Sequence, residues 1–242
     1  MASFISKNTI ERIAKDIKYI RKNPLKDNGV FYKHSDEELL IGYALIVGPK
    51  DSFYSGGFYL FKFEYPFDYP YSPPKLTFLT NDGYVRFHPN LYKNGKVCLS
   101  ILNTWKGEGW TSCQSISSIL LTIASILDYE PLCKEPGLEK THIDFDNYNK
   151  IIEFKNIELA VIQVIKKNFH ENIINLFWDE ILDNFYKNYD SYIVTINNML
   201  NKLENTDNLI YKTQVYCLQI NCNYKKLLEN LEKIYKKYNK KN

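Results

Sequence analysis

The sequence of 242 residues lacks several features that would assign it to a particular class of protein. It has no apolar run near the ~20 residues that a membrane span requires. It has no glycine-rich loop of the kind that holds a nucleotide phosphate, so direct use of ATP is not expected. Its 31 basic and 28 acidic residues nearly balance, which is not typical of a dedicated nucleic-acid binder. These absences predict a protein without a membrane or nucleic-acid partner.

Cysteine and histidine are scarce, with five and four residues respectively. The odd number and irregular spacing of the cysteines favour reduced thiols over a disulfide framework. Cys217 and Cys222 have no histidine nearby, so we expect no metal site. The charged start of the chain does not resemble a signal peptide. We therefore expect a cytoplasmic protein, with the nucleus as a second compartment (of the host cell, if the gene is viral).

Proline and glycine are absent from the last part of the chain. All nine prolines and ten glycines lie at or before residue 137. Because both residue types interrupt regular structure, their absence predicts nearly continuous helix beyond about residue 140. We expect a core domain over residues 1–168 and a helical C-terminal extension over residues 169–242. The helices of the extension either pack on one another and on the domain, or select a partner.

The first residues predict an amphipathic helix that ends before Pro24. Four isoleucines lie on one face at helical spacing, and lysines that include Lys15 and Lys18 share another. This basic face is either solvated or a docking surface for an acidic partner.

Three segments further along have the composition of β-strands and predict an antiparallel meander: residues 39–47, 56–65 and 75–80. Residues 66–74 contain four prolines, so they form a rigid extended loop and not a central strand. An apolar stripe over residues 115–127, with Ser115 as N-cap, predicts a buried helix.

The stretch between residues 83 and 102 holds the candidate chemistry. It starts with a stiff turn, His88-Pro89-Asn90, and ends in a short apolar run that carries Cys98. On spacing alone, Cys98 is either a partly exposed nucleophile or a small buried apolar residue.

Taken together, these residues resemble the active-site signature of ubiquitin-conjugating (UBC) enzymes. Cys98 follows Asn90 by eight positions, as in that family, and Trp110 follows further on. The proline-rich loop with Tyr71 and Pro73 resembles the family's own loop. The motifs occur in the right order within about residues 5–165, which makes a chance match untenable.

The resemblance implies an α+β UBC fold, with a four-stranded antiparallel meander sheet flanked by helices and a mostly α-helical C-terminal extension. Trp110 follows Cys98 by twelve residues instead of the family's usual eight. That longer spacing resembles a subclass of larger members with helical extensions.

The resemblance also implies the chemistry. Cys98 would accept ubiquitin, or a ubiquitin-like modifier, as a thioester from a ubiquitin-activating enzyme and pass it to a lysine, usually with a ubiquitin ligase. ATP would be used by the activating enzyme, so this chain needs no cofactor. Asn90 would donate a hydrogen bond to the oxyanion, hold the loop in shape, or do both. His88 would be a structural residue of the turn and not a base.

Further roles follow from the same resemblance. Glu135 is the candidate for an acidic gate beside the cysteine, with Asp128 and Glu130 as alternatives and a purely structural role for Glu135 equally open. Trp110 would support the core more than contact a partner.

The resemblance also places the partner surfaces. Tyr71, Pro73 and Ser112 would face ligases, and Lys15 and Lys18 would face the activating enzyme. Where the family often has Ser-Pro-Ala after the tryptophan, this chain has a sequence without proline, which predicts a looser loop and puts a ligase contact at Ser112 in doubt.

Two other classes of function compete with an active conjugating enzyme. A non-catalytic scaffold of the same fold would lack the cysteine. An unrelated cysteine hydrolase would need a base histidine in a signature context, and none of the four histidines has one.

Overall fold

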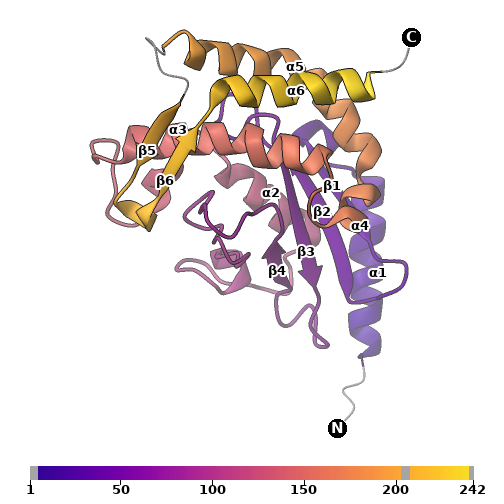
Figure 1. The fold of residues 1–242 in the computed structure, drawn as a ribbon. Helices are drawn as coiled ribbons and strands as arrows, with labels where there is room; N and C mark the ends of the chain where they lie inside the picture. Colours follow the sequence, from indigo (N-terminus) through magenta and orange to yellow (C-terminus); the bar gives the residue numbers. More distant parts are fainter. Residues whose placement is uncertain (1–4, 203–207, 240–242) are drawn as a thin grey trace. The chain divides into compact units, whose positions relative to one another are not determined.

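The computed structural model describes residues 5–202 and 208–239. The chain forms two compact units: residues 1–49 with 59–127, and residues 50–58 with 128–242. The elements of both are labelled in Figure 1. The division that the sequence predicts at residue 168 falls inside the second unit, and it remains a prediction about where the family domain ends.

The first unit begins with the predicted amphipathic helix, α1 (Lys7–Lys22). The Ser6 hydroxyl caps it by accepting a hydrogen bond from the Thr9 backbone N–H at 3.0 Å. Ile13 and Ile20 are buried, whereas Ile10 is exposed, so only part of the isoleucine stripe packs inward.

The first unit also contains a four-stranded sheet in the order β1-β2-β3-β4. Its strands are β1 (Val30–His34), β2 (Ile41–Val47), β3 (Phe58–Glu64) and β4 (Lys75–Phe78). The pairs β1–β2 and β3–β4 are antiparallel. The predicted meander is confirmed, and β1 is the strand that no residue pattern located. It lies at a sheet edge, and only Val30 is fully buried there, so its apolar signal is weak.

The core of this unit is aromatic. Phe61 and Phe78 face each other across β3 and β4 with ring centroids 5.4 Å apart, and Phe87 meets Tyr59 at 6.0 Å. The predicted helix is α2 (Ile116–Ile126), and Ser115 caps it by accepting from the Ser118 backbone N–H. Its buried isoleucines close the core against α1, β1 and β2.

A charged network fastens α1 to the proline-rich loop. Asp16 is only 7% exposed and accepts hydrogen bonds from Arg12 Nε at 3.1 Å and from the Tyr69 hydroxyl. Burial and the hydrogen bond to Asp16 raise the pKa of Tyr69 well above its ordinary value, so its hydroxyl stays protonated as a donor. The loop that bears Tyr71 is therefore anchored to the first helix.

The second unit is mostly helical. It contains α3 (Phe145–Lys155), which continues as a π-helix over Asn156–Gln163, and then α4 (Glu171–Leu176), α5 (Trp178–Leu200) and α6 (Tyr224–Tyr238). Short 3₁₀ turns occur at Pro131–Lys134 and Val215–Cys217. Among the residues described, no helix combines the length and apolarity that crossing a bilayer demands.

A hairpin interrupts this helical region, so the prediction of nearly continuous helix is wrong there. β5 (Leu209–Lys212) pairs antiparallel with β6 (Gln219–Cys222). The turn between them contains neither proline nor glycine. It forms because Tyr216 and Cys217 themselves adopt positive φ angles, of 63° and 52°. Three hydrogen bonds to two acidic residues hold this turn. The backbone N–H groups of Gln214 and Val215 donate to Asp144, and the Tyr216 hydroxyl donates to Glu135.

The extension packs inside the second unit. β5 and β6 contact α3, and α6 contacts α5 and the π-helix. The rings of Phe154 and Tyr224 meet edge to face at 5.2 Å. The extension therefore packs on its own elements and on α3, as one of the two alternatives predicted. A role of the extension in partner selection stays a prediction.

We predict that Asp16→Asn lowers the free energy of unfolding by about 1–3 kcal/mol, because it removes the charge that pairs with a mostly buried guanidinium. Urea denaturation measures the loss. Glu11→Gln is the control, since Glu11 pairs with Lys7 at the exposed start of α1 and the change should stay within ~0.5 kcal/mol. Equal effects of the two substitutions would contradict the importance of the network.

Candidate active site

The turn that carries Asn90 is built around a buried histidine. His88 is fully buried, and its Nδ1 accepts the backbone N–H of Asn90 at 3.0 Å. The backbone N–H of Leu91 donates to the His88 carbonyl at 2.9 Å, which closes the turn. Because the imidazole is occupied in holding the backbone, the geometry agrees with a structural role for His88.

Cys98 lies against this turn through two hydrogen bonds. Its backbone N–H donates to the Asn90 carbonyl at 2.9 Å, and Asn90 Nδ2 donates to the Cys98 carbonyl at 2.5 Å. The eight-residue spacing seen in the sequence thus becomes a direct contact. An amide nitrogen carries two hydrogens, so one remains for a further acceptor.

The Cys98 side chain is buried, with 2% of its surface exposed. The expected partial exposure of Cys98 is therefore wrong, whereas its role as nucleophile stays a prediction. The cause is the apolar run itself: Val97, Leu99, Ile101 and Leu102 are all buried and draw the backbone inward.

Thr104 is a residue that the sequence reasoning missed. Its Oγ1 accepts the backbone N–H of Leu99 at 2.9 Å and donates to the Val97 carbonyl at 3.1 Å. One hydroxyl therefore fixes the backbone on both sides of Cys98. The available signal was a threonine after a short turn, a residue type that often hydrogen-bonds nearby backbone.

Trp110 supports the proline-rich loop. Its indole N–H donates to the Pro70 carbonyl at 2.7 Å, and its ring lies 6.0 Å from that of Tyr69. Tyr71, the next residue of this loop, is 71% exposed. The arrangement fits the predicted supporting role for Trp110 and leaves Tyr71 available to a partner.

Arg12 holds the loop that follows Trp110. Its guanidinium donates to the carbonyls of Ser112 and Gln114, and it also lies over the Tyr69 ring at 5.6 Å. The sequence predicts a looser loop here because the family's proline is missing, and these contacts show how the chain holds it instead. The side chain of Ser112 is exposed, as are Lys15 and Lys18 on α1.

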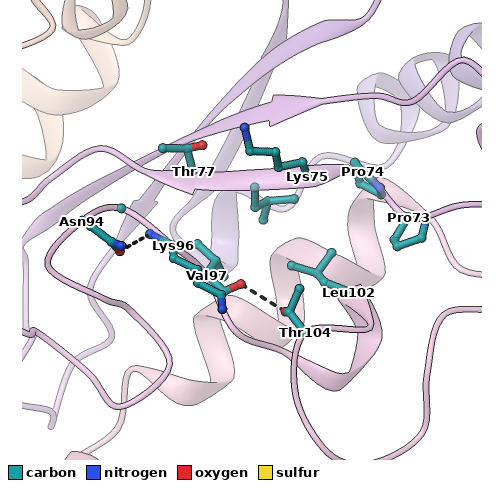
Figure 2. A pocket seen from close by; sticks show the side chains of 11 residues that line it. Pro73, Pro74, Lys75, Thr77, Asn94, Lys96, Val97, Leu102 and Thr104 are labelled. Carbon is teal, nitrogen blue, oxygen red and sulfur yellow. Dashed lines mark hydrogen bonds between the residues drawn. The ribbon is translucent and has the colours of Figure 1, made fainter.

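A cavity of about 630 Å³ opens beside residues 94–97, which directly precede Cys98 (Figure 2). β4 forms one wall with Lys75 and Thr77, and the segment before Cys98 forms the other with Lys96 and Val97. The backbone N–H of Phe78 donates to the Gly95 carbonyl at 2.7 Å and joins the two walls. Two lysines and no acidic residue line the cavity, so its own charge is positive.

The three candidates for an acidic gate belong to the second unit, where each has a partner. Asp128 pairs with Lys134 at 2.8 Å, and Glu130 pairs with Lys140. Glu135 accepts from the Tyr216 hydroxyl. These contacts support the structural alternative for Glu135, and the gate stays a prediction. Within the described ranges, no group of three or more histidine, cysteine or acidic residues could hold a metal ion.

Comparison with known proteins identifies relatives of this chain. The family model described as ubiquitin-conjugating enzyme matches residues 12–158. The ubiquitin-conjugating enzyme E2 Z of Danio rerio is 40% identical over 190 residues, which cover 77% of this chain and 57% of that protein. The Homo sapiens protein of the same name is 44% identical over 158 residues, 64% of this chain and 44% of its own. This chain therefore spans about half the length of these curated relatives.

A solved structure is also similar. Human ubiquitin-conjugating enzyme E2 G1 aligns with a TM-score of 0.42 and 33% sequence identity, over 48% of this chain and 90% of that one.

The burial of Cys98 predicts slow alkylation. We expect iodoacetamide to modify Cys98 at least about tenfold more slowly than the exposed Cys113, as peptide mass spectrometry would measure. Thr104→Val should speed the modification of Cys98, because it frees the backbone on both sides. Thr122→Val in α2 is the matched control and should leave that rate unchanged. Equal rates for the two cysteines in the unsubstituted chain would show that the sulfur is accessible.

Proposed function

Because the chain belongs to the ubiquitin-conjugating enzyme family, we propose that it accepts ubiquitin, or a ubiquitin-like modifier, as a thioester on Cys98 and passes it to substrate lysines. A ubiquitin-activating enzyme delivers the modifier and uses the ATP, and a ubiquitin ligase usually brings the substrate. The pair of hydrogen bonds between Asn90 and Cys98 is the observation that supports this proposal most directly.

The first step exchanges one thioester for another. The Cys98 thiolate attacks the modifier's C-terminal carbonyl, a new C–S bond forms, and the activating enzyme's thiolate leaves. The carbonyl stays activated throughout. Because Cys98 is only 2% exposed, this attack requires a local opening of the residues around it.

In the second step the amine of a lysine attacks the thioester. A C–N bond forms, the C–S bond breaks, the amine loses a proton, and Cys98 regains a thiolate. Negative charge develops on the carbonyl oxygen between these events. A neutral amide donor stabilises that charge without attacking the thioester itself.

In this proposal Asn90 serves both roles that the sequence left open. One hydrogen of its amide is committed to the Cys98 carbonyl and holds the loop. The second hydrogen belongs to the same nitrogen and therefore lies beside the reacting residue. The conformation of the loop and the stabilisation of the oxyanion thus both depend on the Asn90 side chain.

Exposed residues of the first unit, together with the half-buried Pro73, supply the proposed partner surfaces. Lys15 and Lys18 project from α1 toward solvent, which suits an acidic surface on the activating enzyme. Tyr71 and Pro73 lie in the proline-rich loop that Trp110 and Asp16 brace, and Ser112 lies in the loop that Arg12 holds. An exposed aromatic side chain on a loop with a braced backbone suits a ligase contact, because the backbone loses little conformational freedom on binding.

We expect a thiol-sensitive band shift on a non-reducing gel after incubation with activating enzyme, modifier and ATP. Cys98→Ala should abolish it, and Cys113→Ala should not. Asn90→Ala should retain charging but slow discharge to lysine by about 10²–10³, the usual effect of losing one oxyanion donor. No charging with any modifier would favour the scaffold alternative, and charging of Cys98→Ala would overturn the assignment of the nucleophile.

Tyr71→Ala should weaken binding to a cognate ligase by about tenfold or more, since it removes an exposed aromatic anchor. Calorimetry or surface plasmon resonance measures the change. Tyr84→Ala removes another exposed tyrosine of the first unit and should leave the affinity unchanged. An unaltered affinity in Tyr71→Ala would dispose of the ligase contact.

A further inference from the structure

The segment between Cys98 and Trp110 is longer than the family's usual spacing, and residues 103–110 form a closed loop within it. One side chain closes the loop, because Asn103 Oδ1 accepts the backbone N–H of Trp110 at 2.8 Å. Asn103 adopts a positive φ of 56°, a conformation that asparagine tolerates better than most residues. The Asn103 carboxamide therefore holds the two ends of the loop together.

The start of this loop is bonded to the backbone on both sides of Cys98. Thr104 follows Asn103 directly, and its backbone N–H donates to the Leu99 carbonyl at 3.1 Å. Its hydroxyl accepts from the Leu99 N–H and donates to the Val97 carbonyl (Figure 2). A movement at the start of the loop therefore acts directly on the two residues that flank the thiol.

The end of the loop is bonded to the proline-rich loop. The indole N–H of Trp110 donates to the Pro70 carbonyl at 2.7 Å, and Pro70 directly precedes Tyr71, the proposed ligase contact. A continuous series of hydrogen bonds thus connects the residue before Tyr71, through Trp110 and Asn103, to the segment in which Cys98 is buried.

Two glycines let the loop lie close to the segment that follows the thiol. A Cβ on Gly109 would lie 2.6 Å from Asn103 Oδ1, the atom that accepts the Trp110 N–H. A Cβ on Gly107, whose φ is 132°, would lie 3.0 Å from the Ser100 Cβ. The glycines therefore leave space for the Asn103 acceptor and for the approach of the loop to Ser100.

We propose that Asn103 is a positioning residue that couples the proline-rich loop to the exposure of Cys98. While its hydrogen bond to Trp110 is intact, the loop holds residues 99–104 closed and the thiol stays buried. A partner that displaces Tyr71 pulls on Trp110 through the adjacent carbonyl and loosens this closure. The inference rests on the proposed function, because attack by Cys98 needs the local opening that this coupling supplies.

The test measures how fast iodoacetamide modifies Cys98 in the full chain, by peptide mass spectrometry and with no modifier present. Asn103→Gly removes the acceptor but places there the residue that adopts a positive φ without strain. We expect it to speed the modification by about fivefold, the effect of one lost hydrogen bond on an opening equilibrium. Asn103→Asp retains an acceptor and should stay within about twofold of the unsubstituted chain. An unchanged rate in Asn103→Gly, or equal rates in the two variants, would overturn the proposal.

Two further variants separate the coupling from the local packing of Asn103. Gly109→Ala crowds the acceptor without changing Asn103, so it should also speed the modification by about fivefold. Trp110→Phe keeps an aromatic ring but loses the bond to Pro70. It should speed the modification in the unsubstituted chain and add less than about twofold in Asn103→Gly, because the loop is already released there. Equal effects of Trp110→Phe in both backgrounds would contradict the coupling.

Glu108→Gln is the matched control, because Glu108 is exposed in the same loop and its substitution should leave the rate unchanged. Charging of Cys98 with activating enzyme, modifier and ATP is measured separately in the same preparations. Normal charging without the expected differences in alkylation overturns the coupling alone. Absent charging of the unsubstituted chain, with those differences present, overturns the proposed function and leaves the coupling supported.

Discussion

Two hydrogen bonds between Asn90 and Cys98 join the stiff turn after residue 87 to the apolar run that bears the thiol. One uses the Cys98 N–H and the other the Cys98 carbonyl, so both backbone polar groups of Cys98 are bonded to Asn90. The buried imidazole of His88 fixes the turn from behind, and the Thr104 hydroxyl fixes the run from the other side. Hydrogen bonds thus hold the backbone around the sulfur, which suits the proposed carrier of an activated group that must not be hydrolysed.

The same principle extends to the loops around the site. Asp16 and Arg12, one turn apart on α1, bind the hydroxyl of Tyr69 and the carbonyls of Ser112 and Gln114. Trp110 adds a hydrogen bond to Pro70. Two loops proposed to meet ligases are thus held by one helix whose lysines are proposed to meet the activating enzyme. Binding of a partner at either proposed surface would therefore act on segments that these polar contacts connect.

The second unit shows how a region without proline or glycine still turns. Tyr216 and Cys217 adopt left-handed backbone angles that glycine would adopt without strain. Asp144 and Glu135 offset that strain through hydrogen bonds to the turn. Glu135 is thereby a fastening point for the hairpin within this unit. The fold of the extension depends on such side-chain contacts as well as on apolar packing.

The sequence alone determined the elements whose signals are local and the motif whose spacing is short. The helices at α1 and α2, three of the four strands and the Ser115 cap were predictable, because periodicity and capping act within a few turns of chain. The eight-residue spacing of Asn90 and Cys98 carried the resemblance to a family, and the hydrogen bonds between the two residues appear only in the tertiary structure. Only the tertiary structure decided that Cys98 is buried, that Arg12 reaches Ser112 a hundred residues away, and that a hairpin interrupts the helices. Burial and long-range hydrogen bonds depend on which segments meet in space, and no pattern along a single stretch of chain records that meeting.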